Sequence, residues 1–351
     1  MDLKISQSNL QIPDNPKETL LQKARKFQGN DGKIDENEMM ELVADAEKGG
    51  MNQDEQEFLA ALMDKGVAQE IVKSNFEPTE MHFQVDASQH ATHQADLNAL
   101  RSKLHTDPSL ATKAVKSNQD ANAKRLDDLV KAKTATAVDQ LDAQVQKNGA
   151  INKDYSHYNG QEEKKLQKKA NDKAGLSSGA NHCAATVGYF FYGQGFKHPA
   201  HMGSTDKAVA FFVYKHFTAA PGKGQNPQFA AQQKADEANG TGRKLFLLKD
   251  GADAKMKTYM KAAHPSFDAD KNSFDWKNLP IRKGDMVFMN PKSASPYGPE
   301  HAAVVKDYDP ATGRMVLIQA NPLAESTYDL SQKADRDKFM GFGRPSASDF
   351  D

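Results

Sequence analysis

The 351-residue sequence has little of several features that define common protein classes. It has a single cysteine, Cys183, so no disulfide within the chain can hold the fold together. No apolar run approaches the roughly 18 residues that a membrane-spanning helix needs, so no membrane-spanning helix is predicted. The 46 basic and 47 acidic side chains leave a net charge of −1, which excludes the positive field that nucleic-acid binding needs. The first residues also lack the apolar segment of a secretory leader, so we expect no cleavable export signal.

The apolar residues that are present are spread unevenly, and this predicts three regions. Residues 1–84 combine helix-capping residues with short apolar periods, which indicates helical hairpins. Residues 85–170 are rich in alanine, glutamine, lysine and aspartate, and we expect a polar helical spacer or bundle there. Residues 171–351 hold most of the aromatic side chains, so the main core should form in this region. Its polar segment 193–275 is predicted to be an insertion that folds outside any functional site, with helices around 208–216 and 252–263.

Capping patterns predict where the first helices begin. Each pattern has a capping residue followed three positions later by a glutamate: Asn15 with Glu18, Asp35 with Glu38, and Asn52 with Glu55. A looser copy of the pattern lies at 148–154. We interpret these segments as the starts of short helical hairpins.

The segment 27–38 also resembles an EF-hand calcium loop. Gly32 falls at the sixth position of such a loop and Glu38 at the twelfth, with the carboxylate of Asp31 just before the glycine. The first and third positions are Phe27 and Gly29, which have no side-chain oxygen. We therefore expect a helical turn without metal, where any calcium held by Asp31 and Glu38 would be weakly bound.

The C-terminal region contains one clear helix pattern and three strand patterns. A compact apolar and aromatic run predicts a buried helix that begins at or just before Cys183. Strands are predicted at 284–291, 301–309 and 314–322, because each combines β-branched and apolar residues with turn residues at its ends. The turn residues at 309–313 join the last two strands into a hairpin. These elements predict an α+β domain with an antiparallel sheet.

Cys183 and His301 are the candidates for nucleophilic catalysis. A cysteine at a helix N-terminus faces unpaired backbone N–H groups, which favour the thiolate over the thiol. His301 opens a predicted strand, where its imidazole can act as the base for that thiolate. Alternation along the next strand places Gln319 and Asn321 on one face, so one of them can orient His301. The sequence thus predicts a cysteine–histidine–amide triad that attacks a carbonyl group.

Other readings of these residues remain open. A lone cysteine is often simply a small buried side chain, and Cys183 fits that description too. His182 is a rival base, but adjacent side chains on a helix point about 100° apart, so we expect it to form part of a pocket wall. Tyr297 and Glu300 precede His301 and are predicted to line the substrate cleft.

The order of these motifs resembles the papain-like cell-wall hydrolases of the CHAP and NlpC kind, over about 171–351. The resemblance is carried by Cys183 opening a helix, Gly-Asp-Met-Val-Phe at 284–288, His-Ala-Ala-Val-Val at 301–305, and Gln-Ala-Asn at 319–321. It implies a papain-like α+β fold with a nucleophile helix on an antiparallel sheet. It also implies amidase or endopeptidase action on peptidoglycan stem peptides, without a required cofactor.

The same resemblance assigns catalytic roles and shows two departures. In the CHAP pattern the last pair is Glu-x-Asn, which puts Gln319 and Asn321 at the third and fourth catalytic positions beside Cys183 and His301. Here a neutral glutamine replaces the glutamate, and the separation of Cys183 from His301 is longer than the family usually has. A neutral amide can hold the imidazole tautomer but stabilises an imidazolium less than a carboxylate does.

A wall substrate lies outside the cytoplasm, yet no leader is visible. We therefore expect a secreted antibacterial effector, exported by specialised secretion machinery without a cleavable signal peptide. It would act in the periplasm or cell wall of a target bacterium, and an immunity protein would accompany it. Two further hypotheses are a secreted toxin that acts as a protease or deamidase on proteins of a host cell, and a non-catalytic binding protein with a degenerate hydrolase fold.

Overall fold

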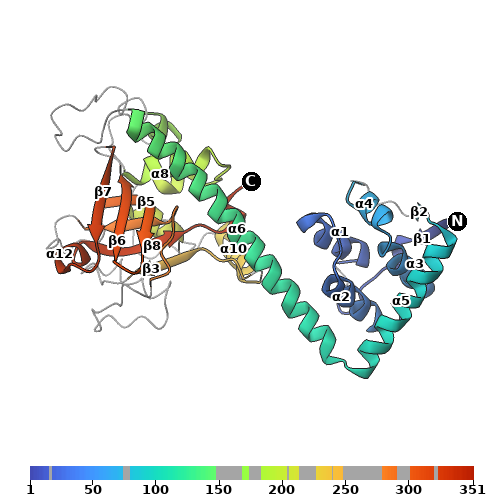
Figure 1. Cartoon of the computed structure of the whole chain (residues 1–351). Helices are drawn as coiled ribbons and strands as arrows, with labels where there is room; N and C mark the ends of the chain where they lie inside the picture. Colours follow the sequence, from blue (N-terminus) through green and yellow to red (C-terminus); the bar gives the residue numbers. More distant parts are fainter. Residues whose placement is uncertain are drawn as a thin grey trace. The chain divides into compact units, whose positions relative to one another are not determined.

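The computed structural model describes residues 1–15, 18–73, 80–147, 168–173, 183–203, 205–212, 227–238, 240–247, 279–290, 301–319 and 323–351 (Figure 1). These residues form a mixture of helices and strands, in agreement with the predicted α+β class. They divide into two compact units, Met1–Asn122 and Ala123–Asp351. Across the described part of the chain, no helix is both long and apolar enough to cross a membrane.

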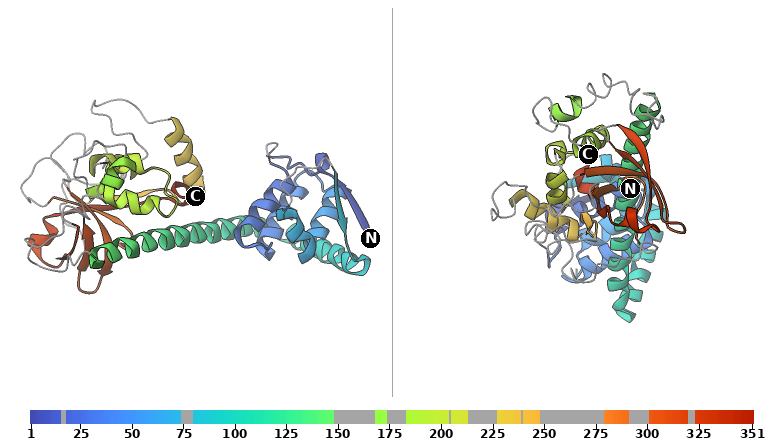
Figure 2. Two further views of the ribbon diagram at one scale, coloured as in Figure 1. Left: turned by 90° about the horizontal axis from the view of Figure 1, so that it is seen from above. Right: turned by 90° about the vertical axis from the view of Figure 1, so that its left-hand side faces the viewer.

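The first unit is a group of helices packed on a two-stranded antiparallel sheet (Figure 2). The strands β1 and β2 pair through Leu3 opposite Phe83 and Ile5 opposite Met81, and these four side chains are buried in the core. The elements are β1 (Asp2–Ser6), η1 (Gln7–Asn9), α1 (Leu20–Asp31), α2 (Glu36–Glu47), α3 (Gln53–Leu62), α4 (Lys65–Lys73), β2 (Glu80–Gln84), α5 (Ala87–Thr106) and the start of α6 (Ser109–Lys147).

Two of the three predicted helix starts are confirmed. Complete capping boxes precede α2, between Asp35 and Glu38, and α3, between Asn52 and Glu55. The prediction for Asn15 was wrong, because α1 begins later, at Leu20. There Thr19 forms the capping box, accepting a hydrogen bond from the N–H of Gln22 at 3.2 Å. The looser copy at 148–154 lies outside the described residues.

The segment that resembles an EF-hand is a tight turn between α1 and α2. Helix α1 continues through Phe27 and ends at Asp31, and Gly32 follows with a φ of 80°, a conformation that favours glycine. The Glu38 carboxylate accepts a hydrogen bond from the N–H of Asp35 at 3.0 Å. Glu38 thus serves the helix start, and Asp31 is helical; calcium binding by this pair stays a prediction. Among the residues described, no three metal-ligating side chains converge.

The second unit contains an antiparallel sheet of six described strands in the order β3-β8-β4-β5-β6-β7. Its strands are β3 (Lys244–Leu247), β4 (Met286–Met289), β5 (His301–Asp309), β6 (Arg314–Gln319), β7 (Ala324–Asp329) and β8 (Phe339–Arg344). The three strands predicted from the sequence are confirmed as β4, β5 and β6, and β5 and β6 form the predicted hairpin.

Helices cover one face of this sheet (Figure 1). They are the second half of α6, α8 (Cys183–Tyr192) and α9 (Thr205–Phe212), and η3 (Pro199–Met202) packs beside α8. The unit also contains α10 (Pro227–Ala238), α12 (Lys333–Arg336) and η5 (Ala347–Asp349). Helix α9 covers the first half of the helix expected at 208–216, whereas the helix expected at 252–263 lies outside the described residues.

The division into units falls inside α6 and does not coincide with the predicted limits at 84 and 170. Leu97 and Leu100 of α5 belong to the core of the first unit. Val138 and Leu141 of α6 are buried in the core of the second unit, against α8 and the sheet. The sparse apolar residues of the segment expected to be a spacer therefore complete both cores.

The Gly-Asp pair before β4 joins the sheet to α6. Gly284 has a φ of +93°, and a Cβ there would lie 2.2 Å from Oγ1 of Thr134 in α6. The buried Asp285 carboxylate accepts hydrogen bonds from Arg344 at 2.8 Å and from the N–H of Arg282 at 2.9 Å. Burial raises the pKa of Asp285, although Arg344 acts in the opposite direction. The pair thus shapes the turn and neutralises a buried guanidinium.

We expect Asp285→Ala to lower the free energy of unfolding of the second unit by ~3–5 kcal/mol, because it leaves the Arg344 guanidinium buried without a counter-charge. The double variant Asp285→Ala/Arg344→Leu should lose clearly less. Urea unfolding followed by circular dichroism measures both. The exposed pair of Lys124 and Asp128 supplies the control, since Asp128→Ala should change stability by no more than ~0.5 kcal/mol. Equal losses in the single and double variants would contradict the assignment.

Candidate active site

Three secondary-structure elements meet where the candidate catalytic residues lie. Cys183 is the first residue of α8, His301 is the first residue of β5, and Gln319 is the last residue of β6. Helix α8 packs against β5, and β5 pairs with β6. The sequence-distant residues therefore come together at one end of the sheet, with the Cys183 side chain buried.

The Cys183 sulfur contacts three groups. Its Sγ accepts a hydrogen bond from the backbone N–H of Ala302 at 3.1 Å. The hydroxyl Oγ1 of Thr205, the first residue of α9, lies 3.8 Å from Sγ. The third partner is the His301 side chain, which is near enough to lower the pKa of the thiol through its charge and through hydrogen bonding. The sulfur thus sits among hydrogen-bond donors, an environment that stabilises negative charge.

The His301 ring is held by Gln319. The distance between Nε2 of His301 and Oε1 of Gln319 is 3.1 Å. An amide oxygen only accepts hydrogen bonds, so Nε2 carries a proton and donates it, and Nδ1 is the ring nitrogen left for the sulfur. In the strand register Gln319 lies opposite Ala303, two residues after His301, which makes it a diagonal neighbour on the same face. The predicted alternation is confirmed for Ile318 and Gln319, because Ile318 points the other way into the core. Ala320 and Asn321, the other two residues of that prediction, lie outside the described residues.

The pKa values of Cys183 and His301 are shifted in opposite directions. Burial acts to raise the pKa of the Cys183 thiol, but His301, the N–H of Ala302 and the Thr205 hydroxyl outweigh it, and the pKa is lowered. Burial likewise acts to lower the pKa of His301, but the sulfur and Gln319 outweigh it, and the pKa is raised. Both shifts favour a thiolate beside an imidazolium, the charge state of an activated cysteine nucleophile.

The structure thus brings together Cys183, His301 and Gln319 of the predicted site residues. The remaining ones lie outside the described residues: Asn321, His182, Tyr297 and Glu300. Of the two amides proposed to orient His301, Gln319 occupies that position.

Sequence reasoning missed two groups at the sulfur. The N–H of Ala302 could have been found, because it directly follows His301 at the start of the strand. Thr205 belongs to no motif, and only the packing of α9 beside α8 brings it to Cys183. The expectation that 193–275 folds outside the site was wrong at this point. Because α9 also buries Phe211 and Phe212 in the main core, this part of the segment is a structural component of the site.

Comparisons of the chain with protein-family models, with curated proteins and with solved structures find no match. The chemistry is therefore inferred from the site residues themselves.

The alkylation rate of the single thiol by iodoacetamide, measured against pH, tests the charge state of the pair. The rate rises as the thiolate forms, so its midpoint should lie below the ordinary value of about 8.5 for a free cysteine. His301→Ala should move the midpoint upward, because the imidazole that lowers the pKa of the thiol is removed while burial remains.

His105→Ala is the matched control, since His105 is an exposed histidine of the first unit and should leave the midpoint unchanged. A midpoint that does not respond to His301→Ala would mean that the histidine has no electrostatic influence on the sulfur.

Proposed function

We propose that the chain is a cysteine hydrolase that cleaves amide bonds in the stem peptides of peptidoglycan. The observation that carries the proposal is the contact of Cys183 with His301, whose far ring nitrogen is held by Gln319 at 3.1 Å. A nucleophile, a base and an orienting group in this order are the minimum for acyl transfer. A buried structural cysteine would need none of these partners.

In the first half-reaction the Cys183 thiolate attacks the carbonyl carbon of the scissile amide. The carbonyl π bond breaks and its electron pair becomes the oxyanion of a tetrahedral intermediate. As the first residue of α8, Cys183 has a backbone N–H without an acceptor inside the helix, and this group can donate to the oxyanion. His301 then gives its Nδ1 proton to the leaving nitrogen, the C–N bond breaks, and a thioester with Cys183 and a free amine remain.

In the second half-reaction water replaces the amine. Neutral His301 takes a proton from water through Nδ1 while the water oxygen attacks the thioester carbonyl. The C–S bond breaks, the thiolate and imidazolium are restored, and the peptide leaves as a carboxylic acid that releases its remaining proton to solvent. Gln319 accepts the hydrogen bond from the Nε2–H group throughout, so the ring keeps one orientation and Nε2 keeps its proton during both transfers.

The arrangement of elements supports a papain-like fold. A helix that begins with the nucleophile packs on an antiparallel sheet, and adjacent strands of that sheet supply the base and the orienting amide. The Gly-Asp pair of the sequence pattern has a structural role, because Gly284 allows α6 to approach and Asp285 neutralises Arg344.

The substrate class rests on the sequence pattern, which resembles cell-wall hydrolases, together with a site suited to amide hydrolysis. A peptidoglycan substrate entails action in the periplasm or cell wall of a target bacterium. Secretion as an antibacterial effector, and neutralisation by an immunity protein in the producing cell, are parts of the same proposal.

Incubation of the purified protein with peptidoglycan sacculi, followed by mass spectrometry of the soluble fragments, should yield new amine and carboxylate ends in the stem peptides. Cys183→Ala should lower the rate by ~10⁴-fold or more, because it removes the nucleophile. His105→Ala should retain full activity. Absence of new ends with peptidoglycan, but cleavage of unrelated proteins or deamidation of their glutamines, would overturn the choice of substrate.

Gln319→Glu should shift the alkaline limb of the kcat/KM profile to higher pH. The limb falls as His301 loses its proton, and a carboxylate beside Nε2 raises the pKa of the imidazole further than the amide does. Gln319→Ala should instead lower kcat/KM by ~10²-fold through loss of ring orientation. If the limb of the Gln319→Glu variant coincides with that of the unmodified chain, then Gln319 does not act on His301.

A further inference from the structure

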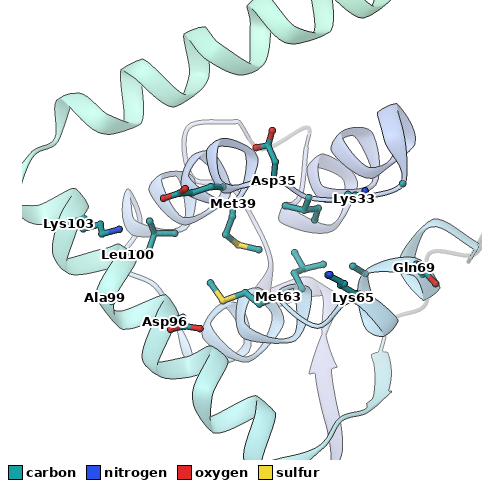
Figure 3. Close-up of a pocket in the computed structure, with 15 residues that line it drawn as sticks. Lys33, Asp35, Met39, Met63, Lys65, Gln69, Asp96, Ala99, Leu100 and Lys103 are labelled. Atoms are coloured by element: carbon teal, nitrogen blue, oxygen red, sulfur yellow. The ribbon is translucent and has the colours of Figure 1, made fainter.

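The first unit contains a cavity of about 540 Å³ that the hydrolase chemistry does not use. Its walls come from α2, α3, α4 and α5 and from the turn between α1 and α2 (Figure 3). A volume of this size falls within the range of ligand-binding pockets. All of its lining residues belong to Met1–Asn122, so it is separate from the site around Cys183.

The floor of the cavity is apolar. Met39, Leu62 and Leu100 are buried there, and Ile34 and Met63 are half-buried. Figure 3 shows the thioethers of Met39 and Met63 pointing toward one another from opposite walls. Methionine side chains are flexible and polarisable, so this floor can adjust to different large apolar groups.

The rim of the cavity carries exposed charges of both signs. Besides Lys33 and Asp35, the rim carries the ammonium groups of Lys65 and Lys103 and the carboxylates of Glu36 and Asp96. None of these four side chains forms an ion pair with another residue that the structure describes. The rim thus offers ammonium groups to a negatively charged ligand group and carboxylates to a positively charged one. These four residues belong to three different helices.

We propose that this cavity binds an amphipathic helical segment of a partner protein. Such a segment places large apolar side chains on the methionine floor and lysine and glutamate side chains against the rim. The mixed rim selects this occupant: a fatty acid or phospholipid headgroup of one sign would meet Glu36 and Asp96 as well as the lysines. A small polar metabolite would find no polar group on the floor.

Fluorescence anisotropy of a labelled 18-residue peptide added to the full chain tests the proposal. The peptide carries leucines at positions i, i+4, i+7 and i+11, with alternating lysine and glutamate elsewhere, and a scrambled peptide has the same composition without an apolar stripe. We expect saturable binding of the striped peptide with a Kd of about 10 μM, and at least ~10-fold weaker binding of the scrambled one.

Two variants block the cavity from its exposed rim. Ala99→Trp on α5 and Gln69→Trp on α4 should each weaken binding at least ~10-fold, because both residues line the cavity and a large ring there occupies it. Ala91→Trp is the matched control, as an exposed alanine of α5 that does not line the cavity, and it should leave the Kd within about twofold. Circular dichroism verifies that each variant is folded.

Three results would overturn the proposal. The first is equal affinity for the striped and scrambled peptides, or no binding of either. The second is binding that neither blocking variant weakens. The third is a different occupant, seen either as dodecanoate that binds more tightly than the striped peptide and is lost in Ala99→Trp, or as self-association of the chain that Ala99→Trp abolishes in sedimentation.

Discussion

The contact between the Cys183 sulfur and the His301 ring is the constraint on which the candidate active site of the second unit depends. It requires the first residues of α8 and β5 to lie side by side, although more than a hundred residues separate them in the sequence. The Ala302 N–H, 3.1 Å from the sulfur, ties the thiolate to the strand itself. Cys183 belongs to a helix and His301 to a strand, so the distance between them is set by how α8 packs on the sheet. A small rotation of α8 would therefore change the reactivity of the thiol.

The position of α8 is fixed from several sides. Gly188 in the middle of the helix leaves no room for a Cβ, which would lie 2.5 Å from the Met202 side chain of η3. Helix α6 packs on the same core and is joined to the sheet at Gly284, where Thr134 fills the space of a side chain. Rigid regular elements hold a site more accurately than loops do, and here they hold all three reacting or orienting groups.

Local patterns allowed correct predictions where a few neighbouring residues determine the outcome. Asp35 and Asn52 cap helices because their partners lie three residues away, and Gln319 faces His301 because strands alternate with period two. The sequence did not reveal Thr205 or the burial of Val138, since both depend on packing between segments distant along the chain. The cap at Asn15 was wrong because Thr19 provides a competing capping box with Gln22.

The solitary thiol has a consequence for durability under oxidative stress. A thiolate reacts readily with peroxide to give a sulfenic acid, and a second cysteine nearby normally resolves that species as a disulfide. This chain has no second cysteine, so repair depends on a small external thiol reaching the sulfur of a residue that is only 8% exposed. Without reduction by such a thiol, further peroxide oxidises the sulfur to sulfinic acid, which is no longer a nucleophile. An oxidising environment would therefore limit how long the Cys183 thiol stays reactive.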